Sequence, residues 1–315
     1  MSKQEIVTVA KGQLATPEDL VKEWKAWTRS EKSPDTANTY DQGFDKFQIW
    51  LADNNKTLIE VKPSLIREWR DELQAEYSRA TVNIRLTAVR QFYSWLIRTH
   101  DVPIPNPAQS IRAKGRDANG FKRDELTSAD VMALLEACND GTDAGKRDAA
   151  LLGLMAYTAM RPNEARLVDM ADFGSRADKN IIWVQGKGYT DKSDYVILGP
   201  NADAVLRPWL AVRGDGAGPI FTSFSNRSKG QRLSRRAARA IWEKRRDQAG
   251  IVGNKKTMHS LRHSAITNAI RHGEPLERVS KMARHQSVET TMRFYAHIER
   301  LDNPAEFSID YENGV

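Results

Sequence analysis

The sequence has almost no cysteine and no apolar run long enough to span a bilayer. Its one cysteine, Cys138, lies in the apolar pattern VMALLEAC, so an internal disulfide is excluded and core packing is the expected role. The most apolar stretch, residues 149–160, is shorter than the roughly 20 residues that a transmembrane helix needs. The N-terminal MSKQEIVTVAKGQL lacks the apolar core of a signal peptide. We therefore expect a reducing, cytoplasmic setting and no membrane partner.

Motifs for metals and nucleotides are absent as well. The chain has no HExxH sequence, no cysteine pair and no carboxylates grouped near its histidines, so zinc sites and two-metal phosphoryl transfer lack ligands. GKG at 186–188 is not a Walker loop, because the preceding glycine spacing and the following Ser or Thr are missing. We expect no metal and no cofactor.

The charge balance favours a polyanionic partner. Lysine and arginine number 48 against 41 acidic residues, which gives a net charge of +7, and 40% of the residues are apolar. Such a composition is typical of a globular protein, and nucleic acid is the commonest partner of a basic one. A basic surface that is merely solvated remains the alternative.

The first third of the chain predicts helices. Residues 1–15 have no strong periodicity and are expected to be flexible, whereas residues 16–111 carry four segments with apolar residues at three- and four-residue spacing. Ser33, Ser64 and Ser78 stand where N-caps are expected. Three prolines within residues 103–107 end this domain, and the basic, glycine-containing stretch 112–124 is predicted to be a linker.

Residues 125–298 predict a second, mixed domain. Residues 149–160 form a near-continuous apolar run, which indicates a fully buried helix. Residues 180–185 and 194–199 are predicted strands joined by a hairpin, and PIFTS (219–223) is a candidate third strand. The remainder is helical. The predicted fold class is mainly α, with an N-terminal four-helix domain and a mixed α/β domain that contains a small antiparallel sheet.

Two short motifs place arginines beside groups that could orient them. Arg161 directly precedes Pro162, which suits a first helical turn, and Glu164 three positions on can reach back to the guanidinium. His259 and Arg262 lie at i and i+3 on one helical face, with His263 expected to point away. Two guanidinium groups suit the non-bridging oxygens of a phosphate. An ordinary Arg–Glu pair and a surface helix with incidental histidines are the structural alternatives.

A tyrosine near the C-terminus is the candidate nucleophile. Tyr295 follows His285 by ten residues, which in an unbroken helix would set the two about 15 Å apart. We therefore expect a turn after His285 and a short separate helix that carries Tyr295. Tyr311 is the rival, but its acidic setting IDYEN would raise the pKa of the phenol. Lys187, at the predicted hairpin tip, suits a mobile general acid.

These segments together resemble the tyrosine recombinases of the phage integrase and Xer family. RDAALLGLMAYTAMRPNEARLV, VQGKGYTDK, TMHSLRHSAIT and ARHQSVETTMRFYAH follow one another in that family's order, after a helical domain similar to its core-binding domain. The resemblance covers about residues 16–298. It implies site-specific cutting and rejoining of duplex DNA through a 3′-phosphotyrosyl intermediate. The implied catalytic residues are Arg161, Glu164, Lys187, His259, Arg262, His285 and the nucleophile Tyr295.

The resemblance also implies a role for each residue. Arg161 and Arg262 would bind the non-bridging oxygens and stabilise the transition state in place of a metal. Lys187 would protonate the leaving 5′ oxygen, His259 would assist as acid and base, and His285 would hydrogen-bond the phosphate.

The chain departs from the family pattern at three places. Ala159 and Arg284 stand where the family commonly has glycine, which puts the local loop geometry in doubt. Many members place the tyrosine nine residues after the histidine, a position that Phe294 holds here. Because phenylalanine has no nucleophilic atom, Tyr295 remains the predicted nucleophile.

Basic residues outside these motifs are expected to contact the DNA. The strongest candidate is the helix that begins near Arg232. The predicted DNA-binding residues are Arg79, Asn83, Arg85, Arg90, Arg112, Lys114, Arg232, Arg235, Arg236, Arg239, Lys244 and Arg245. The expected partners are double-stranded DNA with inverted-repeat core sites and further copies of the chain: a monomer when free or a dimer per site, and a homo-tetramer in the synaptic complex. The tail, residues 299–315, is expected to dock on a neighbouring protomer, and the protein is expected to associate with the nucleoid.

Two other functions remain open at this point. A catalytically silent, sequence-specific DNA-binding protein could use residues 266–285, which resemble a helix-turn-helix reader. That alternative does not explain why the candidate catalytic residues occur together in this sequence. A type IB topoisomerase would use similar chemistry without a synaptic partner, but the first domain and the tail favour a recombinase.

Overall fold

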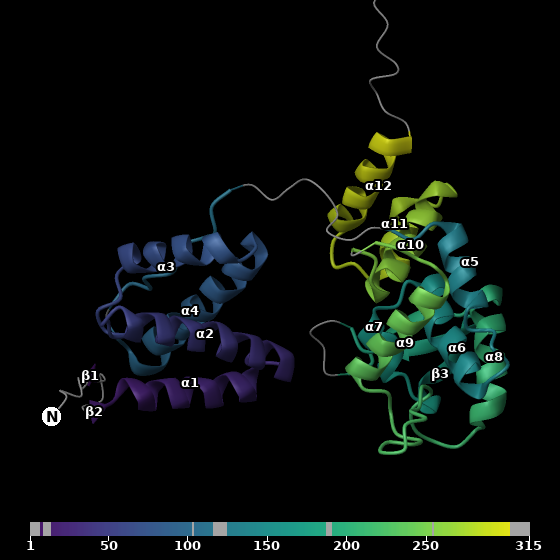
Figure 1. Ribbon diagram of the computed structural model, residues 1–315, viewed down its shortest axis with the longest axis horizontal. Helices are drawn as coiled ribbons and strands as arrows, with labels where there is room; N and C mark the ends of the chain where they lie inside the picture. Colours follow the sequence, from purple (N-terminus) through teal and green to yellow (C-terminus); the bar gives the residue numbers. More distant parts are fainter. Residues whose placement is uncertain are drawn as a thin grey trace, which may run out of the picture. The chain divides into compact units, whose positions relative to one another are not determined.

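The chain divides into two compact units, residues 1–119 and 120–315. The computed structural model describes residues 7–8, 14–102, 104–115, 125–186, 191–253 and 255–302 (Figure 1). Helices dominate both units, and the second also holds a small antiparallel sheet, so the predicted fold class is confirmed. Residues 116–124 of the predicted linker and residues 303–315 of the predicted tail lie outside the described residues.

The first unit contains the four predicted helices. They are α1 (Pro17–Glu31), α2 (Pro34–Asp53), α3 (Pro63–Glu76) and α4 (Arg79–His100). Two short antiparallel strands precede them, β1 (Val7–Thr8) and β2 (Leu14–Ala15). No sequence pattern predicted these strands, because two residues are too few to show an alternation.

Serine and proline define where these helices begin. The Ser33 and Ser78 hydroxyls accept hydrogen bonds from the backbone N–H groups three residues on, as predicted for N-caps. Ser64 is not a cap. The N-cap of α3 is Lys62, and Pro63 takes the first helical position, which its fixed φ favours, so Ser64 lies inside the first turn.

This difference allows a matched test of capping. Replacement of Ser78 by alanine removes an N-cap bond and is expected to lower the free energy of unfolding by about 1 kcal/mol. Ser64→Ala is the control, and its effect should be smaller because the Ser64 side chain caps no helix. Urea denaturation followed by circular dichroism measures both variants, and equal effects would contradict the assignment.

Aromatic side chains form the core of the first unit. The rings of Trp24, Phe44 and Phe92 are fully or almost fully buried, and their centroids lie 4.8 Å (Trp24–Phe44) and 4.4 Å (Phe44–Phe92) apart. Gly43 brings α2 close to α4, since a Cβ at that position would lie 3.1 Å from the Cβ of Ala88. The helical spacing of apolar residues in the sequence therefore predicted this core correctly.

The second unit has eight α-helices among its described residues. They are α5 (Ser128–Glu136), α6 (Asp143–Thr158), α7 (Pro162–Leu167), α8 (Pro200–Arg213), α9 (Arg235–Gln248), α10 (Met258–Arg271), α11 (Leu276–Ala283) and α12 (Val288–Asp302). Helix α6 holds most of the predicted apolar run and is buried along nearly its whole length. It packs closely on α8, since a Cβ at Gly153 would lie 2.8 Å from a methyl group of Val205.

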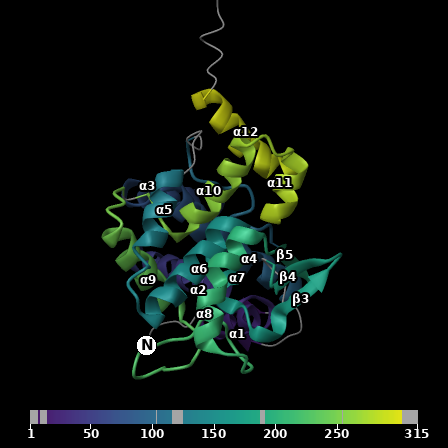
Figure 2. The same cartoon turned by 90° about the vertical axis from the view of Figure 1, so that its right-hand side faces the viewer.

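The small sheet has three antiparallel strands and lies at one side of this unit (Figure 2). Its strands are β3 (Phe173–Arg176), β4 (Lys179–Val184) and β5 (Asp194–Ile197), in that order, and the 3-10 helix η1 (Met170–Asp172) leads into it. The two predicted strands correspond to β4 and β5. The third strand is β3 and not PIFTS, because residues 219–223 make only isolated bridges to Asp169, Lys229 and Arg232.

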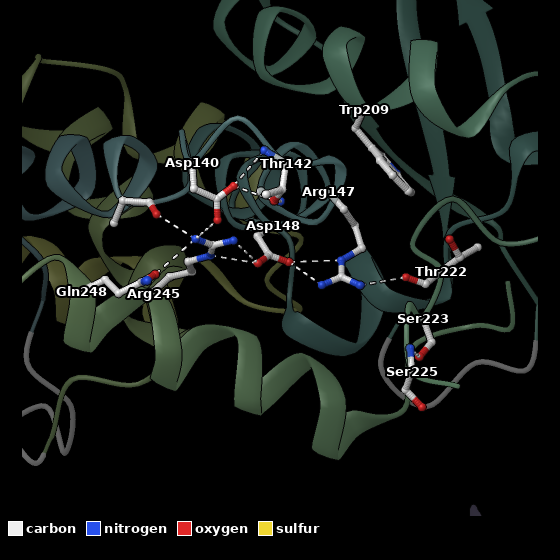
Figure 3. A network of polar contacts seen from close by, with 12 residues as sticks. Asp140, Thr142, Arg147, Asp148, Trp209, Thr222, Ser223, Ser225, Arg245 and Gln248 are labelled. Carbon is white, nitrogen blue, oxygen red and sulfur yellow. Dashed lines mark hydrogen bonds and ion pairs between the residues drawn. The ribbon is translucent and has the colours of Figure 1, made fainter. Parts of the chain in front are cut away.

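A buried ion-pair network connects α6 and α9 (Figure 3). Arg245, on α9, is fully buried and lies 2.8 Å from Oδ2 of Asp148 on α6 and 2.8 Å from Oδ2 of Asp140. Arg147 donates to the other oxygen of Asp148 at 2.7 Å and to the Thr222 carbonyl at 3.1 Å. Because each buried charge faces an opposite charge, this network is stable only when it is complete.

Candidate active site

Arg161 lies at the junction between two helices. Helix α6 ends at Thr158 and α7 begins at Pro162, with Arg161 as the extended N-cap residue between them. Glu164, in the first turn of α7, is buried and accepts a hydrogen bond from the Arg161 backbone N–H at 2.8 Å and another from its guanidinium. The predicted contact of Glu164 with the guanidinium is therefore present.

Arg262 is buried where two helix C-termini meet. It lies on α10 with only 6% of its surface exposed and donates to the carbonyl of Ala159, which follows α6, at 2.5 Å. It also donates to the carbonyl of Ala283, the last residue of α11. The last carbonyls of a helix have no partner within the helix, and the helix dipole makes that end negative. The negative C-terminal ends of α6 and α11 therefore both stabilise the buried positive charge of Arg262.

A third guanidinium, that of Arg284, enters the same site. Its side chain is 4% exposed, and its Nη2 lies 2.7 Å from Oε2 of Glu164. Its Nη1 donates to the Met282 carbonyl at 2.8 Å. The sequence showed Arg284 only as a departure from a family glycine. The available signal was an arginine directly before the predicted histidine His285.

Both departures from the family glycines keep the backbone that glycine would adopt. Ala159 has φ +54° and Arg284 has φ +53°, so both are left-handed residues that cap helices. Such a conformation costs a residue with a Cβ roughly 1–2 kcal/mol. The local loop geometry, which the sequence put in doubt, is therefore left-handed at both positions.

The site carries a net positive charge. Burial alone would raise the pKa of Glu164, but Arg284 and Arg161 outweigh it and the net shift is downward. Burial, together with the charges of Arg161 and Arg284, lowers the pKa of Arg262 to about 9, so it is still protonated at pH 7. Three guanidinium groups around one carboxylate attract an anion strongly in a desolvated site.

His285 is held in the turn between α11 and α12. Its Nδ1 lies 2.9 Å from the hydroxyl of Thr291, a fully buried residue of α12. Burial, and after it the charges of Arg262, Arg161 and Arg284, lower the pKa of His285 to about 4. At neutral pH the ring is uncharged and can act as a hydrogen-bonding group.

Helix α12 buries Phe294 and exposes Tyr295. Phe294 packs with its ring centroid 5.0 Å from that of His263 and 6.0 Å from that of His285, whereas 41% of Tyr295 is exposed. His263, expected to point away from the site, lies against this ring. The predicted turn and separate helix are present, but α12 begins at Val288 and runs to Asp302 (Figure 1).

His259 and Arg161 line the same cavity. The cavity has a volume of about 600 Å³ and lies among α7, α9 and the start of α10. Arg235, Arg239 and Trp242 of α9 also line it. Helix α9 therefore presents basic side chains next to two of the predicted catalytic residues. Lys187 lies outside the described residues.

The neutral state of His285 predicts a loss of stability in acid. In the unfolded chain the His285 ring takes up a proton near pH 6.5, whereas in the folded chain it does so only near pH 4. The free energy of unfolding is therefore expected to fall as the pH drops through this range. His285→Asn should reduce the fall in melting temperature between pH 7 and pH 5. His272→Asn, which changes an exposed histidine at the end of α10, is the control. Equal acid sensitivity of His285→Asn and wild type would contradict the assignment.

One predicted DNA contact is wrong, and others are engaged inside the protein. Arg245 is fully buried in its ion-pair network and cannot reach DNA. Arg90 donates to the carbonyls of Ala108 and Ile111, and Asn83 accepts from the backbone of Ala113, so both anchor the segment after α4.

The other predicted contacts differ in their exposure. Arg232 is half-buried and forms an ion pair with Asp169. Arg79 and Arg85 are half-buried, with Arg85 placed 3.6 Å above the ring of Tyr77. The exposed predicted contacts, which stay predictions, are Arg112, Lys114, Arg235, Arg236, Arg239 and Lys244.

Comparisons with known proteins identify the family. The model of the phage integrase family matches residues 124–301, and the model of the phage integrase N-terminal SAM-like domain matches residues 21–100. The chain belongs to the phage integrase family. The predicted family and enzyme class, a tyrosine-type recombinase, are confirmed.

Relatives of this phage integrase family member span most of its length. Tyrosine recombinase XerC of Pelobacter propionicus is 26% identical over 276 residues, which cover 86% of this chain and 87% of the relative. Tyrosine recombinase XerD of Lacticaseibacillus casei is 25% identical, over 84% of this chain and 87% of its own.

Solved structures share the fold of this family member. XerH site-specific recombinase, in a post-cleavage complex with its palindromic difH substrate, superimposes with a TM-score of 0.72 at 22% identity, over 93% of this chain and 84% of XerH. A lambda integrase dimer bound to a core site gives a TM-score of 0.67 at 14% identity, over 88% and 94% of the two chains.

Two features are absent from the described part of this recombinase. Within it, no helix is both long and apolar enough to cross a membrane. Nor do the described residues include three or more His, Cys, Asp or Glu side chains grouped so that they could hold a metal ion.

Proposed function

We propose that this recombinase cuts and rejoins duplex DNA at specific sites, with Tyr295 as the nucleophile of a covalent 3′-phosphotyrosyl intermediate. The observation that carries the proposal is the meeting of Arg161 and Arg262 at the facing ends of α6 and α11, around the buried carboxylate of Glu164. This arrangement concentrates guanidinium groups in the part of the chain that matches the phage integrase family model, residues 124–301.

The two arginines bind the scissile phosphate. Their contacts within the protein use Nη1 and Nη2 of each, which leaves further N–H donors for phosphate oxygens. The added negative charge of the pentacoordinate transition state is stabilised by these fixed positive groups, which need no reorganisation during the reaction.

Tyr295 attacks phosphorus through its phenolic oxygen. A phenol has a reference pKa near 10, so positive charge near the phosphate assists its deprotonation. As the P–O(Tyr) bond forms, the bond to the 5′ oxygen breaks, and Lys187 protonates that oxygen. His259 assists as acid and base, and neutral His285 hydrogen-bonds the phosphate. Attack by a 5′ hydroxyl reverses these steps and rejoins the strand.

DNA and further copies of the chain are the proposed partners. The exposed arginines of α9 contact the backbone beside the cavity that Arg161 and His259 line. The recombinase acts on inverted-repeat core sites as a dimer per site and as a tetramer in synapsis, with the tail docked on a neighbour and the protein associated with the nucleoid. XerH is bound to a palindromic difH substrate, which supports the inverted-repeat site, and a lambda integrase tetramer is bound to a Holliday junction, which supports the tetramer.

A catalytically silent DNA-binding protein accounts for less of the molecule. A surface that only binds DNA does not require a buried Glu164. Nor does it require Arg262, an arginine with a pKa that burial lowers to about 9. These groups are costly to bury, and such perturbed sites are typical of catalysis.

Covalent trapping tests the proposed function. The wild-type protein is incubated in EDTA with nicked half-site DNA from its genomic neighbourhood, and products are separated in detergent. We expect a detergent-resistant protein–DNA adduct with the specific site and none with a scrambled sequence. Specific binding without an adduct on any nicked half-site would overturn the proposal in favour of a silent DNA-binding protein. An adduct that forms only after a divalent metal is added would contradict the metal-free mechanism.

A further inference from the structure

Arg284 occupies a position whose backbone favours glycine. It caps α11 with φ +53°, a conformation that a residue with a Cβ rarely adopts. Nevertheless its long side chain does not extend into solvent, since only 4% of it is exposed. A strained residue with a buried, charged side chain indicates that the side chain has a function at this position.

Hydrogen bonds of the Arg284 guanidinium connect the turn after α11 with the junction before α7. Its Nη2 lies 2.7 Å from Oε2 of Glu164 and 3.3 Å from the carbonyl of Ala159. In return, Arg161 donates to the carbonyl of Arg284 at 3.2 Å, and Arg262 donates to the carbonyl of Ala283. The turn and the junction are thus linked in both directions.

The same turn leads directly to the nucleophile helix. His285 follows Arg284 in the chain and bonds through Nδ1 to Thr291 of α12. Tyr295 lies on that helix four residues after Thr291. A displacement of Arg284 would therefore pass through His285 to the helix that carries Tyr295.

We propose that Arg284 is a positioning residue of the cleavage reaction, which holds the Glu164 carboxylate in place as the anchor of Arg161 and fixes the position of the turn before His285. This inference rests on the proposed function, because it assigns Arg284 to the same site. A glycine at this position would leave Glu164 with the guanidinium of Arg161 as its only direct ion pair among the described residues.

The charges around Glu164 support this role. The groups that face the carboxylate are Arg161 at the start of α7, Arg262 on α10 and Arg284 in the turn, and His285 lies beside these arginines. Burial by itself raises the pKa of Glu164, and Arg284 is the largest of the influences that lower it. Loss of Arg284 should therefore raise the pKa of Glu164, so that the carboxyl group becomes protonated, and inactive as an anchor, at a higher pH.

Single-turnover cleavage measured from pH 5 to pH 8.5 tests the proposal. Arg284→Met is expected to slow adduct formation at pH 7.5 by about 10- to 100-fold, because small misplacements of catalytic groups have effects of this size. The acid limb of its pH profile should move to higher pH than in wild type. Arg284→Lys keeps a charge but not the planar guanidinium. Its cleavage rate and its pH profile should lie between those of wild type and Arg284→Met.

Two controls separate positioning from general damage. Arg278→Met removes an exposed arginine of α11 that pairs only loosely with Glu274, at 3.7 Å, and is expected to keep the wild-type profile. Addition of Arg284→Met to a Glu164→Gln variant should slow cleavage much less than Arg284→Met slows the wild type, because the carboxylate that Arg284 serves is already gone.

Each outcome decides the question. If wild type forms the adduct but both Arg284 variants match its rate and acid limb, the inference is wrong and the proposed function stands. A slower rate with an unmoved acid limb in both variants assigns Arg284 a structural role only and also overturns the inference. If circular dichroism shows that Arg284→Met is unfolded, the rate and profile of Arg284→Lys decide alone. Absence of an adduct with wild type would instead contradict the proposed function itself.

Discussion

Tyr295→Phe is expected to abolish the covalent adduct, with a fall in cleavage rate on the order of 10⁵-fold or more, as found when a nucleophile is removed. The variant keeps the ring but lacks the only nucleophilic atom, so no covalent bond to phosphorus can form. Its affinity for site DNA should change by no more than about twofold, since the ring stays and a single hydroxyl is lost. Detergent gels measure the adduct and gel shifts measure the affinity.

The control for this change is Tyr195→Phe. Tyr195 lies on β5 against Trp183, with 5.7 Å between ring centroids. This variant should form the adduct at the wild-type rate. An adduct that persists in Tyr295→Phe would move the nucleophile elsewhere, and Tyr311 is the first candidate.

Asp148→Asn is expected to lower the free energy of unfolding by about 3–5 kcal/mol, because it leaves two buried arginines without their shared carboxylate. Arg147 and Arg245 are both buried and lie within 2.8 Å of Asp148 (Figure 3). Urea denaturation followed by circular dichroism measures the change.

An exposed ion pair provides the matched control. Asp203 pairs with Arg207 one turn away on α8, and 73% of the Arg207 side chain is exposed. Asp203→Asn should lower stability by less than about 1 kcal/mol, because such pairs are screened by water and salt. Equal effects of the two substitutions would contradict the importance of the buried network.

Local patterns predicted the parts of the site that depend on neighbouring residues. Arg161, Pro162 and Glu164 lie within four positions, so a proline-started helix brings the carboxylate back to the guanidinium regardless of the rest of the fold. The spacing of His259 and Arg262 on α10 is local in the same way.

Local sequence patterns could not predict the contacts between residues that are far apart in the chain. Arg284 pairs with Glu164 across 120 residues, and the pair forms only because α6 and α11 end at the same place. Arg245 resembles its exposed neighbours on α9 in sequence. It is buried because Asp140 and Asp148 come from a loop and a helix about 100 residues earlier. The apolar spacing of Ala238, Ile241 and Trp242 continues to Arg245 and not to Arg239, so the buried face of α9 was open to prediction, whereas the acidic partners of Arg245 were not.

The most direct test of the account is to identify the residue that carries the DNA in the wild-type adduct. The trapped complex is digested with nuclease and trypsin, and mass spectrometry locates the residual nucleotide on a peptide. We expect the nucleotide to be attached to Tyr295 through its phenolic oxygen. Attachment to Tyr311, or to any other residue, would contradict it.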